Sequence, residues 1–315
     1  MPRLLRLTFL FAACVAAAAA SAHAHRGPEI RTEDVARFYA LYEATDGRPT
    51  VEQLDREYLA QGTQSLREFA AARRVTAQRI AERMSAEPAI YARAKDCLAV
   101  LPAVKRRLVP VFAELAELYP RATFPPVAIV VGRGKPVGIT HPAGVTLGLE
   151  ALCAADFMHP DLEERFVRVI AHEYGHIQQS LQTEFEPGDP KATVLRFALA
   201  EGTAELLAEL TSGGVGNGKH AAWTRGKEAE IEGAFVKVMD STDISGWFYD
   251  YRPGSDEPYD LGYWVGYRIV KAYYLNSKDR KAALKDIIEM DDPKAFLQRS
   301  GWTPGMTLPE SALGH

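Results

Sequence analysis

The sequence predicts a mainly α-helical protein of the α+β class, and three observations lead to this class. Apolar residues recur at helical spacing between about residues 30 and 120. Two short β-branched runs bounded by proline and glycine follow, at 124–132 and 144–149. Helical spacing then returns from residue 160 onward. No linker, repeat or low-complexity tract interrupts the chain, so we expect one compact unit with two lobes.

The first 24 residues have the pattern of a secretory signal peptide. Two arginines precede an apolar stretch at 7–20, and residues 22–24 form an A-x-A cleavage site. We therefore expect an exported protein, periplasmic or secreted. Phe11 and the early position of Cys14 do not suit a lipoprotein box, so lipidation is not expected. No other apolar run reaches the roughly 18 residues that a membrane span requires.

The composition of the expected mature chain argues against a polyanionic partner. Residues 1–24 carry two arginines and no acidic residue, so 35 of the 37 basic residues remain against 41 acidic ones, a net charge near −6. This balance predicts no nucleic-acid partner. Two cysteines remain, Cys97 and Cys153. Export permits a disulfide between them, and two separate buried thiols are the alternative.

Residues 25–120 are predicted to form an N-terminal helical region that serves as scaffold. The segment from Thr50 to Gln53 has the pattern of a capping box, which opens one of these helices. The two β-branched runs come next, and we expect two strands directly ahead of the following helix.

The helix predicted over 160–182 carries the pattern HExxH. Pro160 suits its first position, and acidic residues fill its first turn, where the helix dipole favours negative charge. His172 and His176 are four residues apart and lie on one face of the helix, so both can bind a single cation. Glu173, beside the first histidine, can act as general base toward a water on that metal. The pattern therefore predicts the hydrolytic half of a zinc site.

The third ligand has to come from elsewhere, because a catalytic zinc keeps three protein ligands and one open position. Gln179 and Gln182 stand where the class with three histidines has glycine and histidine, which excludes that class. A glutamate from the next helix is the other solution, and Glu201, preceded by apolar residues, is the predicted ligand. Glu205 competes for this role. Otherwise we expect it to accept a hydrogen bond from the ring of a histidine ligand.

The C-terminal part is predicted to be helical over 220–240 and 259–274, with two short helices and a frayed tail after residue 279. Gly262 and Gly266 are four residues apart, which allows a close contact with another helix.

These residues resemble a known group of enzymes. The motif HEYGH followed by a helix with EGTAE is similar to the glutamate-zincins, the thermolysin-like metallopeptidases. It resembles more closely a family of predicted zinc-dependent proteases described as a domain of unknown function, whose C-terminal signature is similar to GYWVGY at 262–267. The resemblance covers about residues 120–275. It implies two histidine ligands and Glu201 as third ligand to zinc, with Glu173 as base.

The resemblance also implies a fold. A zincin-like metallopeptidase domain is expected over 121–300, in which the HExxH helix packs on a small β-sheet beside a helical C-terminal lobe, with 301–315 as a tail. In such a domain an edge strand lines the cleft and pairs with an extended peptide. The resemblance implies that 144–149 has this role.

The predicted function is an exported zinc metallopeptidase that acts on peptides or proteins. Tyr263 and Tyr267, and after them Arg268, are the candidates to stabilise the oxyanion of a tetrahedral intermediate. Two other classes remain open. One is a secreted zinc-binding module or pseudo-protease without turnover, whose fourth ligand is a protein group such as Glu205, and the other is a helical binding protein without metal. Glu173 favours the enzyme, because a structural site needs no base.

Overall fold

The computed structural model describes residues 29–135, 137–141, 144–181, 185–186, 188–250 and 259–313. The predicted signal peptide, 1–24, lies outside these residues. The chain forms two compact units, Met1–Glu173 and Tyr174–His315, and their boundary falls inside helix α9 (Leu162–Gln178). Both are mainly helical, as the sequence predicts.

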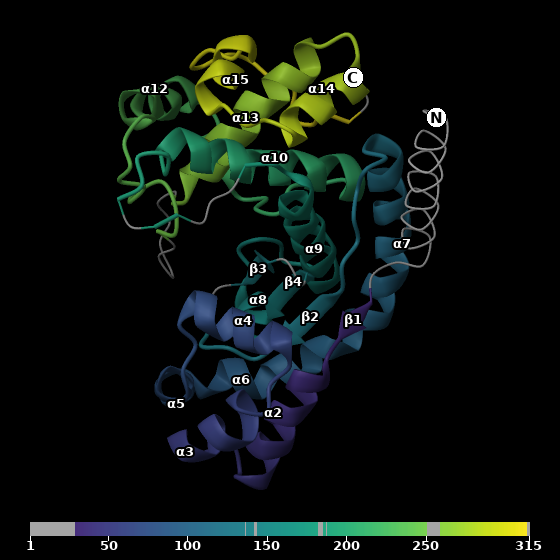
Figure 1. The fold of residues 1–315 in the computed structure, drawn as a ribbon, viewed down its shortest axis with the longest axis vertical. Helices are drawn as coiled ribbons and strands as arrows, with labels where there is room; N and C mark the ends of the chain where they lie inside the picture. Colours follow the sequence, from purple (N-terminus) through teal and green to yellow (C-terminus); the bar gives the residue numbers. More distant parts are fainter. Residues whose placement is uncertain are drawn as a thin grey trace, which may run out of the picture. The chain divides into compact units, whose positions relative to one another are not determined.

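Helices and a small sheet make up the first unit (Figure 1). Threonine residues begin three of its helices: Thr50, Thr63 and Thr76 each accept a hydrogen bond from the backbone three residues on. Thr50 and Gln53 form the predicted capping box. The helical elements are α2 (Glu33–Ala44), α3 (Val51–Gln53), η1 (Leu54–Leu59), α4 (Gln64–Arg73), α5 (Ala77–Ala86), α6 (Pro88–Ala94), η2 (Lys95–Val100), α7 (Leu101–Leu118) and α8 (Leu149–Ala154).

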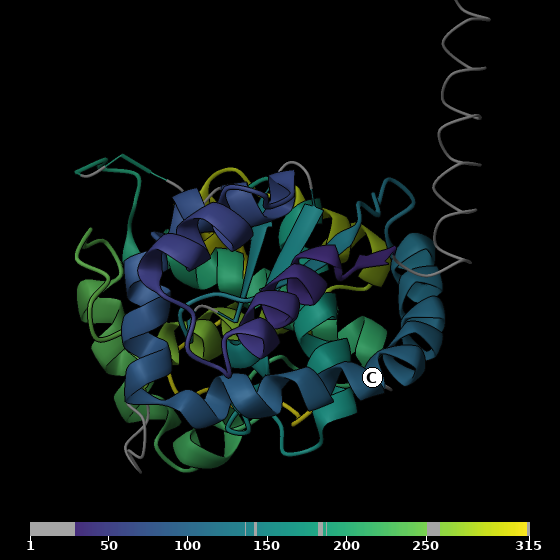
Figure 2. The same ribbon diagram turned by 90° about the horizontal axis from the view of Figure 1, so that it is seen from below.

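The sheet has the strand order β1-β2-β4-β3, in which β1 (Ile30–Arg31), β2 (Val127–Val130) and β4 (Gly144–Gly148) are parallel. Strand β3 (Gly138–His141) runs antiparallel to β4 and forms one edge of the sheet. Helices α2 and α4 pack against these strands (Figure 2). The two predicted strands are confirmed, but the expectation that 144–149 forms an edge is wrong, because β4 pairs on both sides.

The N-terminal helices are tied to the sheet by buried hydrogen bonds. The hydroxyl of Tyr58 donates to the carbonyl of Val131, and that of Tyr91 donates to the carbonyl of Gly132. The buried carboxylate of Glu150 accepts from the backbone N–H groups of Gly132 and Gly134. Burial raises the pKa of Glu150. These bonds explain why the helices before residue 120 and the sheet after it form one compact unit rather than two.

Two helices form the centre of the second unit: α10 (Val194–Ser212) and α13 (Leu261–Asn276), which lie side by side (Figure 1). Gly202 and Gly266 allow this contact, because a Cβ on either would run into the backbone of the other helix. The remaining helices are α11 (His220–Thr224), α12 (Glu228–Val238), α14 (Arg280–Ile288) and α15 (Pro293–Arg299). The single helix predicted over 220–240 is thus two, separated at Gly226, whose φ is +79°.

The C-terminal segment is anchored as far as the structure describes it. The amino group of Lys271 donates to the carbonyl of Glu310, and the backbone N–H of Ala312 donates to the buried carboxylate of Glu209. The prediction of a frayed tail is therefore wrong for this part. None of the helices in the described residues is long and apolar enough to cross a membrane.

Candidate metal centre

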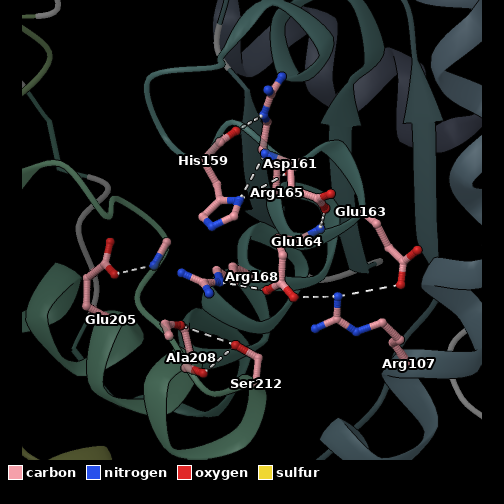
Figure 3. A network of polar contacts seen from close by, with 12 residues as sticks. Arg107, His159, Asp161, Glu163, Glu164, Arg165, Arg168, Glu205, Ala208 and Ser212 are labelled. Carbon is pink, nitrogen blue, oxygen red and sulfur yellow. Dashed lines mark hydrogen bonds and ion pairs between the residues drawn. The ribbon is translucent and has the colours of Figure 1, made fainter. Parts of the chain in front are cut away.

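Helix α9 is held at its start by several polar contacts, which Figure 3 shows. The carboxylate of Asp161 accepts from the backbone N–H of Glu164 and caps the helix. The side chain of Glu164 pairs with Arg107 of α7 at 2.7 Å and with Arg168 at 3.0 Å. The guanidinium of the buried Arg165 donates to four backbone carbonyls ahead of the helix. These contacts fix the first half of the predicted helix, and thereby the place of the HExxH motif.

The structure brings the three predicted ligands together. Nitrogen atoms of His172 and His176 and a carboxylate oxygen of Glu201 all lie within 4.8 Å of one another, the one group of this kind in the described part of the chain. The exposed fraction is 9% for His172 and 5% for Glu201. Two imidazole nitrogens and a carboxylate oxygen this close together could all bind one cation.

Helix α9 packs closely on α10 near Glu201. A Cβ on Gly175 would lie 2.7 Å from the Cα of Ala204, so the glycine lets the two backbones approach. In this packing Oε2 of Glu201 is 3.2 Å from Nε2 of His176. The carboxylate of Glu205 instead accepts from the backbone N–H of Gly216 at 2.6 Å, the dashed line from Glu205 in Figure 3.

These donors fit a zinc ion. With zinc bonds of about 2.0–2.1 Å, two ligand atoms on a tetrahedral ion lie roughly 3.3 Å apart, close to the 3.2 Å between His176 and Glu201. Two imidazoles and one carboxylate form a donor set of catalytic zinc, which leaves one coordination position open. The group therefore matches an open, catalytic type of zinc site.

Gln179 contacts the ring of His176. Its side-chain nitrogen lies 2.8 Å from Nδ1 of His176, and its Oε1 is buried without a hydrogen-bond partner among the described residues. A half-turn of the amide exchanges these two atoms. When Nε2 of His176 binds a metal, Nδ1 carries a proton, and the turned amide accepts it through oxygen. With its amide turned, Gln179 would make the kind of contact that the sequence analysis expected of Glu205, and its spacing of three residues from His176 was a usable signal.

We expect Gln179→Leu to weaken zinc binding by about 10- to 100-fold, the range found when the outer partner of a metal-bound histidine is lost. Competition with a chelating dye measures this affinity. Gln179→Glu is the matched control and should retain tight binding, because a carboxylate also accepts the proton on Nδ1. Wild-type affinity in the leucine variant would contradict the role.

The predicted base lies beside the ligands. Glu173 is 8% exposed and follows His172 directly in α9. Its carboxylate contacts strand β3, where Thr140 is a hydrogen-bond partner at 2.8 Å. Thr140 was not a site candidate from the sequence, because glycine and threonine between prolines gave no strand pattern.

The three residues predicted as candidates to stabilise the oxyanion have different contacts in the structure. The hydroxyl of Tyr267 donates to the carboxylate of Glu209 at 2.7 Å, and Glu209 lies two turns beyond Glu201 on α10. Burial and the charge of Glu209 raise the pKa of Tyr267. Arg268 pairs with the buried Glu232. We therefore leave Tyr267 and Arg268 out of the proposed site. The ring of Tyr263 lies near those of His220 and Phe248, and Tyr263 stays a candidate.

Asp260 is a further carboxylate that the sequence analysis did not single out. It precedes α13 with a φ of 52°, and its carboxylate accepts from the backbone N–H of Asp250. Burial, together with the charges of Asp250 and Glu201, raises the pKa of Asp260 to about 6. An aspartate ahead of a helix was a weak signal, because N-terminal caps commonly have this residue type.

Comparison with known proteins finds a family model that matches part of the chain. Residues 153–293 match the model of a family described as predicted Zn-dependent protease (DUF2268). A search of curated proteins and a search of solved structures found no match to the chain. The matched residues include both histidines, Glu173, Glu201 and all of α13, and zinc is the metal that the family description names. Residues 153–293 are therefore similar to the family described as predicted Zn-dependent protease.

Proposed function

We propose that the protein is an exported zinc metallopeptidase, which hydrolyses peptide bonds with Glu173 as general base. One observation carries the proposal: two histidines and the buried Glu201 form a group next to a second buried glutamate, Glu173, that the ligand set does not use. A structural zinc site has no need of that second carboxylate. A hydrolytic site does.

Each residue has a defined task in this proposal. His172, His176 and Glu201 would hold the zinc, which would lower the pKa of a bound water toward 7 and polarise the substrate carbonyl. Glu173 takes a proton as the water attacks the carbonyl carbon, and it delivers that proton to the leaving amine. Tyr263 remains the candidate for a hydrogen bond to the oxyanion.

We further propose that an extended substrate pairs with β3 rather than with β4. Strand β3 is the edge of the sheet among the residues that the structure describes, and edge strands leave backbone N–H and C=O groups free to bind a peptide. The strand contacts Glu173 through Thr140, so a peptide along it passes beside the base.

Two features support export. The first is the signal-peptide pattern of residues 1–24. The second is the disulfide between Cys97 and Cys153, which the sequence left open and which joins η2 to α8. Disulfides persist in oxidising compartments such as the periplasm or the extracellular medium.

The alternative of a closed zinc module is less well supported. It requires a fourth protein ligand, and the metal-binding group found in the described part of the chain has three members. Glu205, the expected fourth ligand, is outside this group, and its carboxylate accepts a hydrogen bond from the backbone N–H of Gly216.

The test is hydrolysis of a mixed peptide library, read by mass spectrometry. We expect internal cleavage by the zinc-loaded protein, none after removal of the metal by a chelator, and recovery when zinc is returned. Cleavage that persists in metal-free protein would overturn the proposal. Tight zinc binding with no cleavage of any peptide would favour the closed module.

A further inference from the structure

Strand β3 contacts the carboxylate of Glu173 at two points, and the first is Thr140. Its hydroxyl oxygen is 2.8 Å from Oε2 of Glu173 and 3.0 Å from the backbone carbonyl oxygen of the same residue. An ionised carboxylate and a carbonyl are both acceptors, so the hydroxyl is the donor. Hydrogen bonds to charged groups are among the stronger ones in proteins.

The second point is Gly138, two residues earlier and on the same face of β3. A Cβ at this position would lie 2.5 Å from Oε1 of Glu173, which is closer than side chains approach. The glycine therefore leaves room for one carboxylate oxygen while Thr140 holds the other. The opposite face of the strand has a different set of contacts, in which His141 binds Thr146.

We propose that Thr140 is a positioning residue for the general base, and that Gly138 provides the space that this position of the carboxylate requires. The proposal rests on the function proposed above. A glutamate has three side-chain torsions, and the last of them is only broadly restricted, so its carboxylate needs an outside contact to be fixed. A misplacement of about 1 Å in a reacting group can cost about 100-fold in rate. Thr140 supplies that contact from a strand outside the family match at 153–293.

The experiment compares Thr140→Val, which removes the hydroxyl at nearly constant volume, with Thr140→Ser, which keeps it. We expect the valine variant to lose about 10- to 100-fold in kcat, with KM and zinc content unchanged. The serine variant should recover most of the activity. Thr146→Val is the matched control, because it removes a hydroxyl from the other face of the sheet, and its kcat should stay at the wild-type value.

Two results would overturn the proposal. One is a valine variant with wild-type kcat, and the other is a serine variant as impaired as the valine variant. Gly138→Ala adds an independent arm: the new methyl group presses on Oε1, and we expect a loss of kcat with Thr140 still present. An alanine variant with full kcat would contradict the steric part.

A double-mutant cycle separates this proposal from the proposed function. The unfolding equilibrium constant is measured in urea for wild type, Thr140→Val, Glu173→Ala and the double variant. We expect the valine change to raise that constant about tenfold when Glu173 is present, and much less when it is absent. Coupling without peptide cleavage by wild type would refute the proposed function alone. Absence of coupling would refute the contact.

Discussion

Replacement of Glu173 by glutamine is expected to lower kcat by about 10²- to 10⁴-fold, the contribution typical of a general base. The amide has nearly the same volume as the carboxylate but does not accept a proton at neutral pH. Because Glu173 is not among the three ligands, zinc content and affinity should remain at the wild-type values. Steady-state cleavage of a peptide found in the library screen, with metal analysis of the same samples, measures both quantities.

Glu163→Gln is the control for this variant. It makes the same change on the same helix, at a side chain that is 33% exposed and pairs only loosely with Arg107 at 3.5 Å. Its kcat should equal that of wild type. If Glu173→Gln and Glu163→Gln behave alike, Glu173 is not the base. If Glu173→Gln loses zinc together with activity, the carboxylate belongs to the ligand set instead.

The sequence predicted the parts of the site that depend on local spacing. Helix α9, its acidic first turn and the pairing of His172 with His176 all follow from periods within one helix, and the structure has them. Close helix contacts at Gly175 and Gly266 could also be predicted. A glycine inside a helix lowers the stability of the helix by about 1 kcal/mol relative to alanine, and close packing against another helix can offset this loss.

Strand β3 was missed because its residues show no alternation of apolar and polar side chains. It exists through pairing with β4, a contact between segments that the sequence pattern alone does not reveal. Its site residues, Gly138 and Thr140, were missed with it. Tyr267 was a candidate as the last residue of GYWVGY, but the direction of a phenol depends on the packing of α13 on α10. In the structure its hydroxyl points toward Glu209.

Glu201 and Glu205 could not be separated by spacing, because residues four apart lie on the same face of a helix. The position along α10 at which it crosses α9 decides between the two glutamates, and the close approach of Gly175 to Ala204 fixes that position.

The second large expected effect concerns Glu201. Glu201→Gln should weaken zinc binding by more than about 100-fold, beyond the range for an outer partner, because it removes an anionic ligand.

Glu205→Gln is the matched control for that loss. Its amide oxygen still accepts from the backbone N–H of Gly216, so the fold and the zinc affinity should both be retained. Equilibrium zinc titration of both variants against a chelating dye measures the difference. Zinc loss in Glu205→Gln alone would exchange the two glutamates, and would mean that α10 meets α9 one turn further along. Because His172 and His176 are on α9, such a shift would keep HExxH as the centre of the site and change only which carboxylate completes it.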